Sequence, residues 1–429
     1  VHRAAERGED QLAAVLLLAQ SDGYRAAGDP AGALHLVQEG LTLEHVEPRT
    51  RERLLNSGVG LASTLSELEL ARRYAAEWVA VTEQRVSPED PDTLRDLSFS
   101  LRRLGDVTRD LGDPATAATH YQQSLTISQQ LAQQLDTPQA QRDLSVTLNR
   151  LGDVIHGLGD PATAATHYQQ ALDIAQRLAQ QLDTPQALRD LSISLNRLGD
   201  IARDPATAFT HYQQALDIAQ RLAEQLDTSQ ALRDFSYSLN ELGDVTRDLG
   251  DPATAATLYQ HGLDIRRRLV EQLDTSQALR ALSYSLNRLG DVTRDLGEPT
   301  TAAAHYQQAL DITQRLAQQL DTPQTQRDLS YSLNRLGDIT RDLGDPTTAR
   351  TYHQQALDID RRLAEQLGTA PALQDLQKGL ADLARTEEEL GNAEAAAALR
   401  AELATVSDQL EALSDDPPDP PPDRSSPQR

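Results

Sequence analysis

Tyrosine, asparagine, aspartate and arginine recur at helical spacing within a segment that the chain repeats. In residues 276–322, Tyr284, Asn287, Asp291 and Arg294 follow one another at steps of three, four and three residues. In a helix, this spacing places the four side chains on one face. An asparagine amide offers a donor and an acceptor to a peptide backbone, tyrosine adds stacking area, and arginine pairs with carboxylates. The pattern therefore predicts a face that binds an extended peptide.

Equivalent residues occur in other copies of the segment, and the predicted binding set includes them. The set comprises Asn149, Asp153, Asn196, Asp200, Tyr237, Asn240, Asp244, Arg247, Tyr284, Asn287, Asp291, Arg294, Tyr331, Asn334, Asp338 and Arg341. A structural interpretation stays open, because near-identical repeats carry any residue in every copy. In that interpretation each asparagine bridges two neighbouring helices. Each aspartate then forms a surface ion pair with the arginine three residues on, as in Asp291 and Arg294.

The sequence contains no motif for catalysis or metal binding. The chain has no cysteine, which excludes disulfides, thiol nucleophiles and cysteine-based metal sites. It has no Gly-Lys-Ser/Thr phosphate loop, no Gly-x-Ser-x-Gly turn and no His-Glu-x-x-His motif. Histidines recur beside tyrosines at His120, His167, His211 and His305, but equivalent positions of stacked helices lie roughly 10 Å apart. We expect half-buried structural histidines, and no catalytic residue, cofactor or metal.

Charge narrows the classes of partner. The 429 residues include 40 basic and 65 acidic side chains, a formal net charge of −25. This balance argues against nucleic acid and anionic membranes, which need a dense basic surface. It favours a protein or peptide partner with basic or neutral extended segments. The longest apolar run, residues 12–19, is too short to span a bilayer and follows acidic residues, so we expect a cytoplasmic protein.

The chain is a repeat array. The triplet Leu-Gly-Asp, first seen at Leu104, recurs at intervals of 47, 47, 44, 47 and 47 residues. Self-similarity at a nearly fixed period indicates stacked structural units. The predicted repeats are 91–137, 138–184, 185–228, 229–275, 276–322 and 323–369, which together span 91–369. Residues 1–90 are predicted to form degenerate helices of the same kind, 370–412 a degenerate capping repeat, and 413–429 a disordered tail rich in proline and aspartate.

Each repeat is predicted to form two helices, as residues 138–184 illustrate. Thr137 and Pro138 begin the first helix, Gly159 ends it in the left-handed conformation, and Asp160 caps the second. This break excludes one continuous coiled coil. The 44-residue copy lacks three residues at the end of its first helix, which we expect to be shorter. The predicted buried stripes are Leu144, Leu148, Leu151, Ile155 and Leu158, then Ala164, Tyr168, Ala171, Leu172, Ala175, Leu178 and Leu182.

The spacing within each repeat resembles the tetratricopeptide repeat, whose signature is Leu-Gly, then a small residue, an aromatic residue and alanine in the second helix. The matching residues here are Leu151, Gly152, Gly159, Ala164, Tyr168 and Ala171. At 47 residues the repeat exceeds the usual length of about 34 and is similar to the long repeats of kinesin light chains. The resemblance implies an all-α, right-handed solenoid of antiparallel helix pairs, whose first helices line a concave groove. In kinesin-light-chain-like repeats, asparagine rows of this kind contact a bound peptide.

Three functions fit this architecture. The first is a non-enzymatic scaffold that holds a peptide or protein along the first helices, with weak sites summing along an extended partner. The second is the C-terminal sensor arm of a larger bacterial signalling enzyme, such as an NTPase switch or a caspase-like protease, because such proteins carry similar arrays. The third is self-association through the open ends. Arginine makes up all but one of the 40 basic residues, which suggests a GC-rich bacterial genome, and Val1 is compatible with a GTG start or with a fragment.

Overall fold

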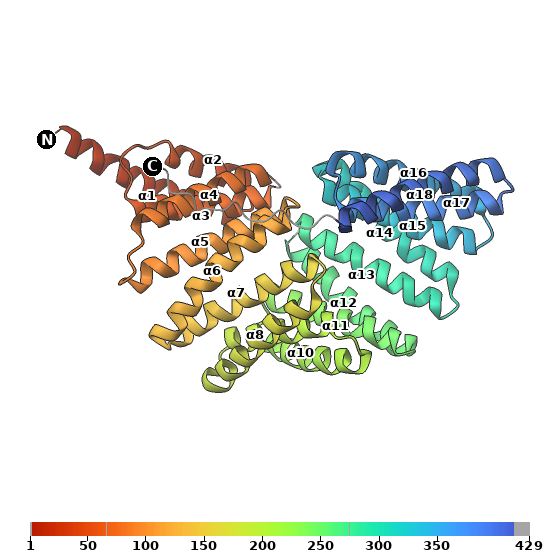
Figure 1. Ribbon diagram of the computed structural model, residues 1–429, viewed down its shortest axis with the longest axis horizontal. Coiled ribbons are helices and arrows are strands. Elements are labelled where there is room, and N and C mark those ends of the chain that lie inside the picture. Colours follow the sequence, from red (N-terminus) through yellow and green to blue (C-terminus); the bar gives the residue numbers. More distant parts are fainter. Residues whose placement is uncertain (1, 66, 274, 416–429) are drawn as a thin grey trace. The chain divides into compact units, whose positions relative to one another are not determined.

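The computed structural model describes residues 2–65, 67–273 and 275–415, and these ranges contain helices joined by turns (Figure 1). The chain divides into two compact units, 1–245 and 246–429. The first unit contains α1 (His2–Ala26), α2 (Pro30–Leu41), α3 (Pro48–Thr64), α4 (Leu68–Arg85), α5 (Pro91–Asp110), α6 (Pro114–Leu135), α7 (Pro138–Gly157), α8 (Pro161–Leu182), α9 (Pro185–Ile201) and α10 (Pro205–Leu226). The division falls within α11 (Ser229–Asp248). The second unit contains α12 (Pro252–Leu273), α13 (Ser276–Asp295), α14 (Pro299–Leu320), α15 (Pro323–Asp342), α16 (Pro346–Leu367), α17 (Ala370–Glu389) and α18 (Ala393–Asp415).

Helices pack in chain order within each unit, which confirms the predicted all-α arrangement of helix pairs. In the first unit each helix from α1 to α9 contacts its successor, and in the second unit each helix from α12 to α17 does so. Odd-numbered helices also contact one another, as in the pairs α5 and α7 or α13 and α15. These are the first helices of the repeats. In each unit they form one side of the stack, which we call the first-helix face.

The helix ends of the repeat at 138–184 are as predicted. The Thr137 side chain accepts a hydrogen bond from the Ala140 amide at 3.2 Å, and Gly159 has a φ of +89°. Asp160 accepts from the Thr163 amide at 3.0 Å. Hydrogen bonds donated by the Thr163 side chain and amide hold the pKa of the Asp160 carboxyl below its ordinary value. Local capping chemistry thus determines where these helices begin and end.

The length of α9 and the end of α18 test two further predictions. Helix α9, in the 44-residue copy, has 17 residues where α7 has 20, which confirms the predicted shortening. Helix α18 continues to Asp415, so the first residues of the predicted disordered tail, 413–429, are helical. The remainder of that tail, 416–429, lies outside the described residues.

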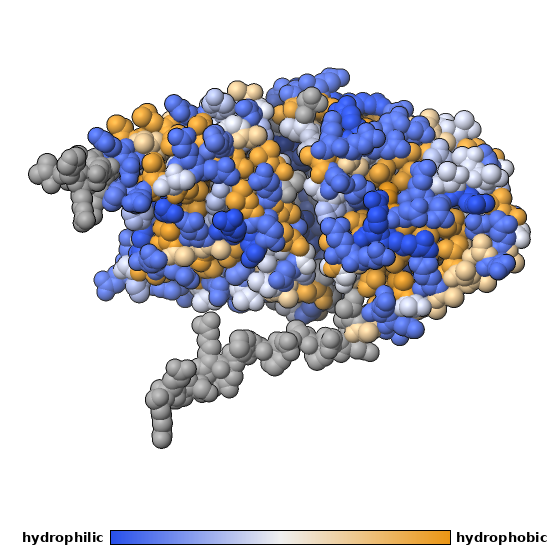
Figure 2. All heavy atoms as spheres, turned by 90° about the horizontal axis from the view of Figure 1, so that it is seen from above, coloured by the Kyte–Doolittle hydropathy of each residue, from blue (hydrophilic) through white to orange (hydrophobic). Residues whose placement is uncertain are grey.

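Two leucines predicted in the buried stripes are exposed instead. Leu158 is 50% exposed and Leu182 is 42% exposed. Leu158 is the C-cap residue of α7 and Leu182 is the last residue of α8, so both lie where their helices end. The helical period places a side chain on the correct face but does not tell where the covering neighbour stops. Figure 2 shows apolar side chains reaching the surface among hydrophilic ones.

The Leu-Gly pair of each repeat gives the core tyrosine its place. Tyr168 is 1% exposed. A Cβ atom added to Gly152 would lie 2.5 Å from the Cε1 atom of that ring, and Gly105, Gly199 and Gly290 are equally close to their tyrosines. Only a residue without a side chain allows the ring to lie this close to the first helix. The aromatic residue and the glycine of the signature therefore form one packing unit.

We expect Gly152→Ala to lower the free energy of unfolding of the first unit by about 1–3 kcal/mol, because the new methyl overpacks the Tyr168 ring. Urea unfolding followed by circular dichroism measures the change. Gly157→Ala on the same helix is the matched control, since a Cβ there meets nothing within 4 Å. Equal stability of the two variants would contradict this explanation of the Leu-Gly signature.

Candidate functional site

The asparagines of the predicted binding set are buried between neighbouring repeats. Asn149, Asn196, Asn240, Asn287 and Asn334 are at most 8% exposed. The Nδ2 atom of Asn149 donates to Ser194 Oγ in the next first helix at 3.0 Å, and Asn196 donates to Ser238 at 3.3 Å. Asn287 donates to Ser332 at 3.4 Å in the second unit. These contacts match the structural interpretation, in which each asparagine bridges two first helices.

Four of these five asparagines retain an unused acceptor. The Oδ1 atoms of Asn149, Asn196, Asn287 and Asn334 are buried and have no hydrogen-bond partner. A bound peptide amide would reach them only if the side chain or its neighbours moved, because the atoms are shielded from solvent. A role for the asparagines in binding therefore stays a prediction, while their role in joining repeats is visible in the contacts.

Three aspartates of the set, Asp153, Asp200 and Asp291, accept hydrogen bonds from core tyrosines, whereas Asp338 faces His353 at 3.6 Å. Tyr306 donates its hydroxyl to Asp291 at 2.6 Å. Arg335, in the next first helix, approaches the other oxygen of Asp291 at 3.3 Å. Burial and the adjacent carboxylate raise the pKa of the Tyr306 phenol, so it stays a hydrogen-bond donor. Asp291 therefore links both helices of its own repeat to the following repeat.

The same linkage recurs in the first unit. Tyr168 donates to Asp153 at 2.9 Å, and Arg197 approaches Asp153 at 2.6 Å. Tyr212 donates to Asp200 at 2.8 Å, across 12 residues instead of 15 because this copy is shorter, but the arginine near Asp200 is Arg197 of the same helix, at 3.4 Å. Burial alone lowers the pKa of Arg197, but Asp153 raises it above its ordinary value. The arginine therefore remains charged in a largely covered position.

The predicted surface pair of Asp291 and Arg294 is wrong. Asp291 is 4% exposed and contacts Tyr306 and Arg335, whereas Arg294 pairs at 2.5 Å with Asp342 of the next repeat. Spacing of three residues permits a pair within a helix, but equivalent positions of stacked helices offered closer partners. The pair does form between Asp338 and Arg341, at 3.3 Å. Arg247 likewise reaches across to Asp295 in the next repeat, and Asp244 is half-buried.

The tyrosines of the set remain partly exposed to solvent, as do the side chains of Arg247 and Arg294, at 31% and 35%. Tyr284 is 38% exposed, and Tyr237 and Tyr331 are half-buried. The guanidinium carbon of Arg335 lies 4.9 Å from the centre of the Tyr331 ring, and its Nη2 donates to the Tyr331 hydroxyl at 2.8 Å. Arg288 stacks on Tyr284 in the same way, at 4.8 Å.

Sequence reasoning missed these stacking arginines. Each lies four residues after its tyrosine, a spacing that places two side chains together on a helix surface. The four-residue spacing of tyrosine and arginine is therefore visible in the sequence. The predicted set instead contained the arginines that lie three residues after the aspartates. The tyrosine–arginine stacks make the accessible part of the first-helix face both aromatic and cationic.

In the first unit a hollow of about 460 Å³ opens on the first-helix face. Its walls come from α7, α9 and α11 and include Ile193, Arg197 and Tyr237. Arg142 at its edge pairs with Asp190 at 2.6 Å. The hollow thus combines an apolar or aromatic floor with fixed arginines, an arrangement that suits a segment carrying both apolar and polar side chains.

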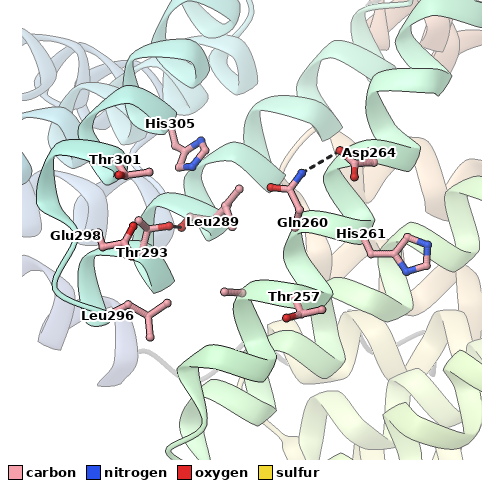
Figure 3. A pocket seen from close by; sticks show the side chains of 11 residues that line it. Thr257, Gln260, His261, Asp264, Leu289, Thr293, Leu296, Glu298, Thr301 and His305 are labelled. Atoms are coloured by element: carbon pink, nitrogen blue, oxygen red, sulfur yellow. Dashed lines mark hydrogen bonds between the residues drawn. The ribbon is translucent and has the colours of Figure 1, made fainter.

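A second kind of hollow, of about 560 Å³, lies between α12, α13 and α14 (Figure 3). Gln260 donates to Asp264 at 2.9 Å on one wall, and His305 lies on the opposite wall. Burial lowers the pKa of His305, and its Nδ1 atom is buried without a hydrogen-bond partner. His120, His167 and His211 show the same two properties. Among the described residues, no three histidines or carboxylates converge to hold a metal ion.

Four segments of the chain match models of a known repeat family. Residues 143–203 match one model of the tetratricopeptide repeat, and 236–272, 282–319 and 329–365 match another. These residues are tetratricopeptide repeats. The predicted repeat family is confirmed there, and repeats of this family form a scaffold for protein interaction. No curated protein matches the sequence of this chain.

Solved structures with similar folds include tetratricopeptide repeat proteins. BtubC of P. vanneervenii aligns with 62% of this chain and 96% of its own, at 21% identity and a TM-score of 0.47. A Rap protein in complex with Competence and Sporulation Factor aligns with 93% of this chain and 99% of its own, at 16% identity and a TM-score of 0.55. A STAND protein with a tetratricopeptide repeat sensor from Pyrococcus horikoshii aligns with 90% of this chain and 55% of its own, at 11% identity and a TM-score of 0.51. The Rap and STAND alignments show a shared fold.

Within the described ranges, every helix is either too short or too polar to cross a bilayer.

Proposed function

We propose that the first-helix face binds an extended peptide segment of a partner protein. The observation that carries this proposal is the repeated tyrosine–arginine stack, at Tyr284 with Arg288 and at Tyr331 with Arg335, 47 residues further on. Aromatic and arginine side chains that are partly exposed yet held in place are typical of binding surfaces. Lys378, 5.6 Å from the Tyr331 ring, extends the same surface onto α17.

The other members of the predicted set support this face from behind. The asparagine bridges and the arginine–aspartate contacts hold successive first helices at a fixed distance. A fixed spacing lets identical weak sites act in register along one ligand, so that affinity accumulates without a deep pocket. The Rap protein that shares this fold was solved with Competence and Sporulation Factor bound, and we transfer only the idea of a ligand-binding array.

A display library of random peptides tests the proposal. Peptides enriched on the wild-type protein are expected to bind the double variant Tyr284→Ile/Tyr331→Ile at least about tenfold more weakly, because each substitution removes a stacking anchor. Isoleucine is the residue at this position in another repeat, Ile193, so the variant keeps a side chain that the fold accommodates. Fluorescence anisotropy of a labelled, enriched peptide measures the affinity.

Tyr24→Ile is the matched control for this experiment. Tyr24 is 49% exposed on α1 in the first unit, whereas both stacks belong to the second unit. Its substitution should leave affinity unchanged. Enriched peptides that bind the double variant as tightly as the wild-type protein would show that the stacks are not the binding surface.

A sensor arm of a larger signalling protein is the second candidate. The STAND protein named above carries a tetratricopeptide repeat sensor, and this chain spans about half of its length. Mass spectrometry of the polypeptide purified from its source through a C-terminal tag distinguishes the two. A mass near 47 kDa favours the free-standing scaffold, and a much larger mass favours the sensor arm.

A further inference from the structure

A hollow of about 610 Å³ on the first-helix face of the first unit differs from the rest of that face in its charge. It lies over α3, α5 and α7. Five arginines line it together with three aspartates; they are Arg95, Arg102, Arg103, Arg142 and Arg150, with Asp96, Asp106 and Asp143. An excess of cations at one place is unexpected in a chain whose formal net charge is −25.

Three of these arginines have close carboxylate partners. Arg95 contacts Asp143 at 2.7 Å, and Arg142 contacts Asp190 of the following repeat at 2.6 Å. Arg150 approaches Asp106 at 3.5 Å, and Asp106 also accepts the hydroxyl of Tyr121 at 2.7 Å. Asp143 and Asp106 are therefore engaged, whereas Asp96, whose side chain is 45% exposed, approaches only Arg85, at 3.8 Å.

Arg102 and Arg103 are the two cations without a close carboxylate partner, and Arg102 is the more deeply buried of them. Arg102 is 8% exposed, and its nearest carboxylate oxygen, on Asp143, lies 3.9 Å away. Its Nη1 donates to the Asp143 main-chain carbonyl at 3.3 Å. Arg103 approaches Asp106 only to 3.7 Å. A buried guanidinium with weak compensation is costly unless an anion completes its surroundings.

The chain itself marks Arg102 as a departure. The equivalent residue in the next two repeats is asparagine, at Asn149 and Asn196. Phe99 lies beneath Arg102, with its ring centre 5.3 Å from the guanidinium carbon, and is 39% exposed. The hollow therefore presents an aromatic ring beside an incompletely paired cation.

We infer that this hollow, which we call the Arg102 hollow, binds a carboxylate side chain of an acidic peptide segment in the partner. The inference rests on the proposed function of the first-helix face and specifies its ligand. The carboxylate would complete the hydrogen bonding of Arg102 and Arg103, and an adjacent apolar residue would cover Phe99. A guanidinium recognises a planar carboxylate through two parallel N–H donors.

The acidic surface elsewhere does not prevent this. Charges more than a Debye length apart are largely screened, and that length is about 8 Å at physiological salt. Within a partly enclosed hollow the effective dielectric constant is lower, so the nearby arginines dominate the local potential. The whole-chain charge still favours basic or neutral segments of the partner where it passes over the outer surface.

Trp78, the single tryptophan of the chain, provides a direct readout. Its ring centre lies 5.5 Å from that of Phe99, in an edge-on arrangement. Capped hexaglutamate added at low ionic strength is expected to change Trp78 fluorescence with a saturable dependence on concentration, whereas capped hexaglutamine is not. Isothermal titration calorimetry of the full chain provides the affinity independently.

Arg102→Asn is the decisive variant, because it installs the residue that the following repeats carry at this position. It is expected to weaken hexaglutamate binding at least about tenfold. Arg72→Asn, an exposed arginine on α4 paired with Glu69 at 2.8 Å, removes the same charge away from the hollow and should have no effect. Equal affinities of wild-type protein and Arg102→Asn would overturn the inference.

The remaining outcomes also decide. Competition by inorganic phosphate at the same concentration as hexaglutamate would mean a general anion site and would overturn the assignment to a peptide carboxylate. If hexaglutamate binding depends on Arg102, but the library peptides bind the wild-type protein and the Tyr284→Ile/Tyr331→Ile variant equally well, the Arg102 hollow is supported and the proposed stacks are contradicted. If the library peptides depend on Tyr284 and Tyr331, but hexaglutamate binding does not depend on Arg102, the inference about the Arg102 hollow is contradicted and the proposed function stands.

Discussion

Asp360→Thr is expected to stabilise the second unit, by an amount that grows as the pH rises. Asp360 is 1% exposed in α16. Its Oδ1 accepts from the Ser330 hydroxyl at 2.5 Å, and its Oδ2 is buried without a hydrogen-bond partner. Burial, together with the nearby Asp375, raises the pKa of Asp360 to about 7, although the Ser330 hydroxyl, Lys378 and Arg327 act in the opposite direction. The wild-type chain thus holds a carboxyl group that resists ionisation.

The sign of the pH dependence follows from proton binding. The ordinary pKa of an aspartate carboxyl, as in the unfolded chain, is 3.8, and the pKa of Asp360 in the folded chain is about 7. Between these values the folded chain binds more protons, so stability that is fully present below the unfolded pKa is lost as the pH rises through the folded pKa. The advantage of Asp360→Thr over the wild-type protein should therefore grow by about 2 kcal/mol between about pH 5.5 and about pH 8.

Urea unfolding at the two pH values measures this difference. Threonine is the matched replacement, because Thr313 occupies the equivalent buried position of the preceding repeat and satisfies its hydroxyl within its own helix at 3.1 and 3.2 Å. Asp358→Asn serves as the control, since Asp358 lies on the same helix with a side chain that is 60% exposed. A stability gain that does not change with pH would show that Asp360 is ionised in the folded chain without penalty.

Features encoded within one repeat could be predicted from the sequence. The helix starts at Thr137 and Asp160 and the turn at Gly159 depend on side chains and backbone conformations only a few residues apart. The period of the array gave the helix pairs, because each helix must bury its apolar stripe against a neighbour. Local chemistry was therefore sufficient for the fold.

Features that depend on the next repeat could not be predicted in the same way. Asn287 lies beside the apolar stripe on a helical projection, but helix α15 covers it and Ser332 accepts its hydrogen bond. The partner of Asp291 in the second helix, Tyr306, is 15 residues away, and Arg335 is 44 residues away. A single repeat shows only half of each such contact. The residues proposed to contact a ligand are therefore the tyrosines and the arginines stacked on them, and no longer the asparagines.

The second large effect is expected at Asp291. Asp291→Ala should lower the free energy of unfolding of the second unit by about 3–5 kcal/mol, the cost of breaking a buried charged pair. The substitution leaves the Tyr306 hydroxyl and the Arg335 guanidinium without the carboxylate that both contact, at 2.6 and 3.3 Å. Because these groups belong to α13, α14 and α15, the loss should appear as early unfolding of all three helices. Hydrogen exchange read by mass spectrometry locates it.

A matched control and a double variant separate the pair from its surroundings. Asp295→Ala lies one turn further along the same helix, where the carboxylate is 38% exposed and pairs with Arg247. It should cost less than about 1 kcal/mol, as exposed pairs do. Adding Tyr306→Phe to Asp291→Ala should recover part of the loss, since the orphaned hydroxyl disappears. If Asp291→Ala proves no more costly than Asp295→Ala, the aspartate–tyrosine–arginine linkage does not hold neighbouring repeats together, and apolar packing alone must do so.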